Sequence, residues 1–276
     1  MDISIRKYKE TDRDALVDYK LNEQQQIYSS LPLDVLDDAL KDENRTANIV
    51  VADDGKIVGF FVLHKHYQHE GYDTPHEVVY VRSLSINEQY QGNGYGTKVA
   101  QYLPVYVQEN FSQFDHLYLV VDGENQGAWN LYERAGFLHT ATKEDGPIGK
   151  ERLYYLDLAR SYVPNLKVVL DEEAESPNVQ FNLVLDDLVV GHIDGEITEK
   201  KLLINNIFVE EEFRERGIAE SAVRQLGTAV RKYLKTVDTV EVFVSESELT
   251  DIFTRAGFVH PHDTSEENHY QKLVRY

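Results

Sequence analysis

The chain has 276 residues, of which 42% are hydrophobic, and its formal net charge is −20. This length suits two ordinary domains, and the apolar content excludes a chain that is disordered throughout. Residues 1–160 carry 26 acidic and 16 basic side chains, and residues 161–276 carry 22 and 12, so each half has a net charge of −10. Such even acidity disfavours nucleic acid as a partner and attracts cationic ligands.

The sequence contains no cysteine, which excludes disulfides, thiolate catalysis and cysteine-ligated zinc. The first eight residues alternate between apolar and polar side chains and lack the apolar core of a signal peptide. No window approaches about 18 consecutive apolar residues, so we expect no membrane span. These features predict a cytoplasmic protein that does not have a membrane partner.

The first half alternates between strand and helix patterns. A hairpin turn is predicted at Asp53-Asp54-Gly55-Lys56, where two apolar strands meet. A first helix is predicted to begin after Thr11 and to run through Leu21. The predicted strands cover residues 3–8, 48–52, 57–64, 78–86, 116–121 and 152–158, and the remaining helices cover 33–40, 95–109 and 126–135.

The second half repeats this order in a shortened form. Gln91 aligns with Arg214 at an offset of 123 residues, and the Ala-Gly-Phe triplet at 135–137 recurs at 256–258, an offset of 121. Two markers at nearly one offset predict an internal duplication. The second copy lacks the helices that follow the first strand of copy one. We expect domains at 1–160 and 161–276, with the boundary between residues 159 and 165.

Glycines dominate the turn before the helix at 95–109, which reads Gln91-Gly92-Asn93-Gly94-Tyr95-Gly96-Thr97. Glycine lets a backbone approach an anion, and a helix N-terminus adds unpaired N–H donors, so this turn suits a pyrophosphate. A P-loop needs Gly-Lys-Ser/Thr, but Gly96 is followed by Thr97 and then Lys98. A dinucleotide-binding fold needs its third glycine one position later and an acid about 20 residues on. Asp122 follows Gly94 by 28 residues, so this alternative stays open but fits poorly.

A second motif covers residues 125–137 and reads Asn-x-x-Ala-x-x-Leu-Tyr-x-x-x-Gly-Phe. On a helix, Asn125, Trp129 and Tyr132 share one face. Gly136 is a natural helix end. We therefore expect this helix to present an amide and a phenol to one ligand beside the preceding strand.

Together the two motifs resemble the GNAT superfamily of N-acetyltransferases. The glycine turn matches that family's Gln/Arg-x-x-Gly-x-Gly/Ala signature, and the later helix matches its Asn…Tyr segment ending in Gly-Phe. The resemblance covers nearly all of residues 1–158. It implies an α+β (mixed α/β) fold with two GNAT-like domains, each a twisted, mostly antiparallel sheet flanked by helices. It also implies acetyl-CoA as the acyl donor and no metal.

The resemblance further implies residue roles. In such enzymes a bulge splays the strand before the glycine turn from its neighbour, and the pantetheine arm lies in the gap. Backbone groups of the splayed strand and the turn amides would then face acetyl-CoA, Asn125 would contact the pantetheine, and Tyr132 would protonate the thiolate. The full set implied for acetyl-CoA is Leu84, Ser85, Ile86, Gln91, Gly92, Asn93, Gly94, Tyr95, Gly96, Thr97 and Asn125, with Tyr132 as the catalytic acid.

The implied reaction is direct attack of a primary amine on the thioester in a ternary complex. Backbone N–H groups would stabilise the oxyanion, and the Tyr132 phenol could protonate a thiolate within hydrogen-bond reach. An ordinary amine has a pKa near 10.4 and is mostly protonated at neutral pH, so a base is needed. Glu23, His76, Glu77 and Tyr80 are candidates, and no spacing singles one out. The expected acceptor is a small-molecule or peptide amine, with cations slightly favoured.

Four histidines lie in or beside a polar loop, at His64, His66, His69 and His76. They lack the spacing and the carboxylate partners of a metal site, so we predict solvated side chains and no metal. A role at the entrance for the acceptor also stays open.

The second copy keeps the glycine-turn pattern at residues 214–219 but differs at the positions that carry chemistry. Phe253 stands where Tyr132 stands, and Glu246 stands where Asn125 stands. Phenylalanine cannot donate a proton, so we predict a non-catalytic domain that packs against the first and shapes its acceptor cleft. Two alternatives stay open for the chain: a non-catalytic acyl-CoA-binding or regulatory module, and a nucleotide-dependent oxidoreductase.

Overall fold

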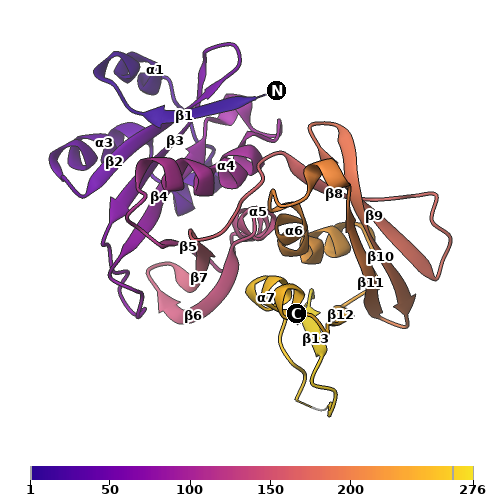
Figure 1. The fold of residues 1–276 in the computed structure, drawn as a ribbon. Helices are drawn as coiled ribbons and strands as arrows, with labels where there is room; N and C mark the ends of the chain where they lie inside the picture. The colour runs from indigo at the N-terminus through magenta and orange to yellow at the C-terminus, as the bar shows by residue number, and fades with distance from the viewer. Residues whose placement is uncertain (1, 263, 276) are drawn as a thin grey trace. The chain divides into compact units, whose positions relative to one another are not determined.

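A computed structural model describes residues 2–262 and 264–275 (Figure 1). The chain forms two compact units. The first contains the residues up to Tyr132 together with His139–Arg160, and the second contains Glu133–Leu138 together with the chain from Ser161 onward. None of the helices in the described ranges is long and apolar enough to cross a membrane.

The first unit is built on a seven-stranded sheet with the order β1-β2-β3-β4-β5-β7-β6. The neighbours β4 and β5 run parallel, and most other pairs are antiparallel. The strands are β1 (Ile3–Lys7), β2 (Arg45–Ala52), β3 (Ile57–Lys65), β4 (Val78–Ile86), β5 (His116–Asp122), β6 (Leu138–Gly146) and β7 (Gly149–Asp157).

Helices cover both faces of this sheet. The helices α1 (Arg13–Val17) and α3 (Pro32–Lys41) bury Leu16 and Leu36 against Ile49 and Phe60 of the sheet. A short helix, α2 (Glu23–Tyr28), lies between them in the chain, and a 3-10 turn at Glu10–Asp12 precedes them. On the opposite face, α4 (Tyr95–Asn110) packs through Tyr106, whose hydroxyl donates to Asn48 Oδ1 at 2.7 Å. Successive strand residues point to opposite faces of a sheet, so Asn48 points to the face covered by α4, and Ile49 points to the face covered by α1 and α3.

The second unit has a six-stranded mixed sheet with the order β13-β12-β11-β10-β9-β8. Only seven residues, 171–177, join β8 to β9, and they contain no helix. The absence of early helices in the second half is therefore confirmed. The elements are β8 (Leu166–Leu170), β9 (Asn178–Leu185), β10 (Leu188–Thr198), β11 (Lys201–Val209), a 3-10 turn at Glu211–Phe213, α6 (Ile218–Tyr233), β12 (Thr239–Phe243), α7 (Ser247–Arg255) and β13 (His269–Leu273).

The predicted mixed α/β fold class is confirmed, with two mostly antiparallel sheets that each have helices packed on them. The first predicted helix was wrong in length, because α1 ends at Val17 and a new helix begins after Asn22. Tyr19 and Leu21 are buried although they lie outside any helix. Three strands were missed, namely β6, β8 and β13; in β6, the polar sequence Leu138–Gly146 carries no apolar alternation.

Candidate active site

The parallel strands β4 and β5 separate before either strand ends. Their ladder pairs Val78, Val79 and Tyr80 with residues 116–118 and then stops. Beyond that point β4 contains one extra residue relative to β3, because Phe60 faces Ser85 while Val62 faces Arg82. Ser83, inside this bulge, has a positive φ of 51°. A bulge bends its strand and ends local pairing, which leaves backbone groups of residues 84–86 beside a gap.

The glycine turn leads from the end of β4 into α4. Gly94 is the N-cap of α4 with a φ of 81°, and a Cβ added there or at Gly92 would meet no atom within 4 Å. The space above the turn is therefore open, and the first-turn amides of α4 have no helical partner. The side-chain amide of Gln91 donates to the Ile86 carbonyl at 2.7 Å, which fastens the turn to β4.

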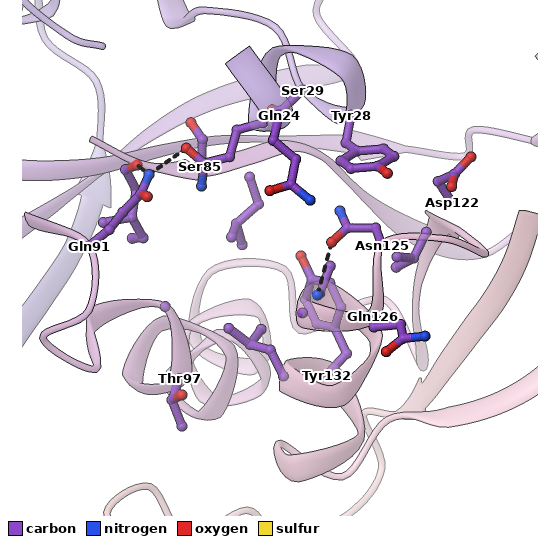
Figure 2. Close-up of a pocket in the computed structure, with 18 of the residues that line it drawn as sticks. Gln24, Tyr28, Ser29, Ser85, Gln91, Thr97, Asp122, Asn125, Gln126 and Tyr132 are labelled. Carbon is purple, nitrogen blue, oxygen red and sulfur yellow. Dashed lines mark hydrogen bonds between the residues drawn. The ribbon is translucent and has the colours of Figure 1, made fainter. Parts of the chain in front are cut away.

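A cavity of about 760 Å³ lies between the separated strands, the glycine turn and the helices α2 and α5 (Figure 2). Its lining includes Asp122 and Glu124 and, among the described residues, no Lys, Arg or His. The anionic part of a ligand would therefore depend on backbone amides and on the N-terminus of α4. The predicted residues that line it are Leu84, Ser85, Ile86, Gln91, Gly92, Gly94, Tyr95, Gly96, Thr97, Asn125 and Tyr132.

The helix α5 (Gln126–Arg134) brings an amide and a phenol to this cavity. Asn125 precedes the helix, and its Oδ1 accepts from the backbone N–H of Ala128 at 3.1 Å. The cap uses the oxygen of Asn125 and leaves its NH₂ as a donor beside the cavity. Figure 2 shows Tyr132 below Asn125, with α2 on the other side of the cavity. Burial raises the pKa of Tyr132, so its hydroxyl is protonated at neutral pH.

One residue of the predicted set and all four candidate bases lie elsewhere. Asn93 is exposed and outside the lining, and its side chain donates to the carbonyls of Tyr90 and Gln91. Ser85 is in the lining, but its hydroxyl pairs with Tyr19 at 3.0 Å, which leaves its backbone for a ligand. The candidate bases Glu23, His76, Glu77 and Tyr80 are all outside the lining.

The sequence reasoning missed the part of the wall that α2 supplies. Asn22, Gln24, Gln25, Tyr28 and Ser29 all line the cavity. One signal was present, because Asn22 is a favourable N-cap residue, and its Oδ1 accepts from the backbone N–H three positions later at 2.9 Å. Asp122 was considered only as the acidic residue of a dinucleotide-binding motif, yet it lines this cavity at the end of β5.

Two substitutions of Asn125 should separate its two contributions. Asn125→Ser keeps a capping oxygen and loses the NH₂ donor; if the cavity binds acetyl-CoA, as the sequence resemblance implies, its affinity should fall about 5- to 10-fold at an unchanged melting temperature. Asn125→Ala loses both groups and should also cost about 1 kcal/mol of folding stability. Calorimetric titration of both variants gives the acetyl-CoA affinity, and thermal unfolding gives the folding stability. A serine variant with wild-type affinity would show that the NH₂ contacts no ligand.

The prediction that the loop histidines are solvated was wrong for two of them. The side chains of His64 and His69 are only 12% and 22% exposed. His69 Nε2 lies 3.2 Å from Glu151 Oε2, and Arg82 donates to His64 Nδ1 at 3.1 Å. Among the residues that the structure describes, no three metal-ligating side chains gather in one place.

His64 should make the folded state sensitive to acid. Burial, together with the charges of Arg45 and Arg82, lowers the pKa of His64 from 6.5 to about 4. Between those two values the unfolded chain binds a proton that the folded chain does not, so stability falls as the pH falls. At pH 5 the free energy of unfolding is therefore about 2 kcal/mol lower than at neutral pH.

Urea unfolding at pH 7.5 and pH 5 tests this assignment. Asn offers an acceptor close to the position of Nδ1 and does not titrate. Between pH 7.5 and pH 5 the free energy of unfolding of His64→Asn should therefore fall by about 2 kcal/mol less than that of the wild type. An equal loss in both proteins would assign the acid sensitivity to other groups.

Known proteins resemble the first part of the chain in sequence. Residues 13–137 match the family model of the acetyltransferase (GNAT) family. The uncharacterized N-acetyltransferase YbbJ of Bacillus subtilis (strain 168) is 31% identical over 155 residues, which are 56% of this chain and 96% of that protein.

Solved structures align with a similar share of the chain. A spermidine N-acetyltransferase from Vibrio cholerae, in complex with CoA and spermine, is 16% identical with a TM-score of 0.46, over 57% of this chain and 96% of that one. The aminoglycoside acetyltransferase AAC(6')-Ib, in complex with coenzyme A and kanamycin, is 21% identical with a TM-score of 0.47, over 56% and 95%. From the family match and the extent of the YbbJ relationship, the chain belongs to the acetyltransferase (GNAT) family.

Proposed function

We propose that this protein is an acetyl-CoA-dependent N-acetyltransferase that acetylates a primary amine by direct attack in a ternary complex. The observation that carries the proposal is one cavity that contains the open glycine turn, the separated β4 edge and the Tyr132 phenol. These three features supply a pyrophosphate site, backbone groups beside a thioester, and an acid.

In this proposal the residues act by binding and by one proton transfer. The amides of residues 92–97 hold the pyrophosphate, residues 84–86 and Asn125 hold the pantetheine, and backbone N–H groups of β4 stabilise the oxyanion. The neutral amine attacks the thioester carbon, the C–S bond breaks, and the Tyr132 hydroxyl protonates the leaving thiolate. The products are an N-acetylated amine and free CoA; the amine's surplus proton passes to solvent, and the Tyr132 phenolate regains a proton from solvent.

We also propose that the two units arose by duplication and that residues 1–160 form the catalytic domain. The second unit repeats the local geometry: β11 carries an extra residue opposite β10, at Asn205, and its ladder with the parallel strand β12 stops at Ile204. Gly217 caps α6 with a φ of 75°, as Gly94 caps α4. These parallels support a common origin for residues 161–276.

The second domain is proposed to lack both chemistry and a CoA site. Phe253 is fully buried in α7 where the first domain has Tyr132. A Cβ at Gly217 would lie 2.5 Å from Ser161 Cβ, whereas the space at Gly94 is open. Arg224 donates to the Ser161 carbonyl and holds this segment over the turn.

We therefore expect one acetyl-CoA per chain by calorimetric titration. A substitution that blocks the first glycine turn should abolish all binding heat, because no second turn is accessible. A stoichiometry of two, or residual binding after that substitution, would show that the second domain also binds CoA.

Release of free CoA from acetyl-CoA across a panel of amines tests the proposed function. We expect release that requires an amine and yields an N-acetyl product. The alternative is a non-catalytic acyl-CoA-binding or regulatory module, which would bind acetyl-CoA tightly and turn over none of the amines.

A further inference from the structure

Asp122, which lines the cavity, lies next to a second carboxylate on the neighbouring strand that is outside the lining. Asp122 on β5 is paired in register with Glu151 on β7. Residues that face each other across an antiparallel ladder point to the same side, with Cβ atoms about 5 Å apart. The strand registers place the side chains of Tyr80 and Tyr118 on this same face of the sheet, opposite the face covered by α4.

Glu151 and one oxygen of Asp122 are withdrawn from water, and neither carboxylate has a Lys or Arg partner among the described residues. Glu151 is 7% exposed, and Oδ2 of Asp122 is buried without a hydrogen-bond partner. Within the described ranges, the two side chains take part in two hydrogen bonds, one from the Glu124 N–H to Asp122 Oδ1 at 2.9 Å and one between His69 and Glu151 at 3.2 Å. Like charges facing each other across strands destabilise a sheet, and buried charges are normally paired. Apart from His69, which is a cation beside Glu151 only when protonated, this pair has no cationic partner among the described residues.

The cations nearest in the sequence are committed elsewhere. Arg152 stacks over the Trp129 ring at 4.7 Å, and Lys150 pairs with Glu144 at 3.2 Å. A Cβ at Gly146 would collide with the Glu151 side chain, so a glycine there leaves room for this carboxylate. The local sequence thus accommodates the buried acid and does not neutralise it.

Aromatic side chains lie beside Glu151. Tyr80 is 3% exposed, and its hydroxyl and that of Tyr72 are buried without hydrogen-bond partners. Burial, with a smaller contribution from Glu151, raises the pKa of Tyr72 to about 12. His69 stacks on the Tyr80 ring at 5.8 Å between centroids. Tyr28 of α2 also lines the cavity that Asp122 lines (Figure 2).

Two carboxylates among aromatic rings suit an alkylammonium ion, which gains both charge pairing and cation–π contact. A divalent metal would need six or more oxygen ligands. The attacking nitrogen must be neutral, and a neighbouring carboxylate favours the protonated form. The carboxylates are therefore suited to a charge that stays on the acceptor, and unsuited to the nitrogen that becomes acetylated.

We propose that Asp122 and Glu151 form an anionic subsite for a second, permanently protonated amine of the acceptor. The acceptor is then an alkyl diamine or a larger polycation, and the subsite sets specificity without a part in proton transfer. This inference rests on the proposed function for the identity of the reaction, but the binding site itself can be measured without turnover.

The test compares 1,4-diaminobutane with 1-aminobutane, together with the diamines of three to six carbons, by calorimetric titration into the full chain saturated with CoA. We expect the best diamine to bind at least 10-fold more tightly than 1-aminobutane. Asp122→Asn and Glu151→Gln should each remove most of that preference while acetyl-CoA affinity stays within about 2-fold. Asp145→Asn, which neutralises an exposed acid on β6, is the matched control and should retain the preference for the diamine.

Equal binding of the diamines and the monoamine by the wild type, or a preference that survives Asp122→Asn, would overturn the proposal. A melting temperature lower in Asp122→Asn than in Asp145→Asn would also contradict it, because it would reveal a structural partner for Asp122. Diamine binding that depends on Asp122, in a chain that acetylates no amine, would refute the proposed function and retain the subsite. Acetylation of monoamines and diamines with equal efficiency would refute the subsite and retain the proposed function.

Discussion

Replacing Tyr132 with Phe should lower kcat about 100-fold and leave the acetyl-CoA dissociation constant within about 2-fold, as expected for a lost general acid. Tyr132 is buried, and its raised pKa keeps the proton on the phenol until a thiolate forms beside it. The substitution removes one oxygen and leaves the ring in place. Initial rates of CoA release and calorimetric titration give the two quantities.

Tyr106→Phe is the matched control for this experiment. It also removes a buried phenol oxygen, one that donates to Asn48 on the side of the sheet covered by α4. We expect about 1 kcal/mol of lost stability and an unchanged kcat. Wild-type turnover in the Tyr132 variant would exclude this phenol as the acid, and an equal loss of turnover in both variants would point to a general disturbance of the fold.

Replacing Gly94 with Asp should weaken acetyl-CoA binding about 100-fold or more. A side chain there enters the open space above the glycine turn, where a carboxylate would meet the pyrophosphate. Asp tolerates a positive φ better than most residues, and an acid is favourable at a helix N-terminus, so the fold should remain stable. Calorimetric titration measures the loss.

Gly94→Asn isolates the effect of charge, because Asn has nearly the same size and the same tolerance of positive φ. We expect the Asp variant to bind at least 10-fold more weakly than the Asn variant, and the difference to shrink at high salt. Equal affinities in the two variants would mean that no anionic group of the ligand lies above the turn.

Features that depend on local sequence could be predicted. The glycines and the apolar period placed α4 within a residue of its observed ends, and the motif at 125–137 placed α5 correctly. Asn125 caps α5 through its oxygen and keeps its NH₂ group as a donor, so one local residue serves both purposes. These properties depend on neighbours a few positions apart, which is the range that pattern reading covers.

Features that depend on tertiary packing could not be predicted. Tyr19 and Leu21 continue an apolar pattern but are buried by packing outside any helix, so periodicity overextended α1. Asp122 and Glu151 meet through a strand register that spans 29 residues, and His69 reaches Glu151 from 82 positions away. No local spacing signals such contacts, and the acceptor side was therefore the least predictable part of the site.

The most direct test of the central claim mixes the protein with acetyl-CoA that carries a deuterated acetyl group, with and without an amine accepted in the panel. Intact-protein and small-molecule mass spectrometry then follow the label. Direct transfer predicts that the label appears on the amine, only when the amine is present, and never on the protein. A labelled protein that later passes its acetyl group to the amine, or label that stays on CoA whatever amine is added, would contradict the account.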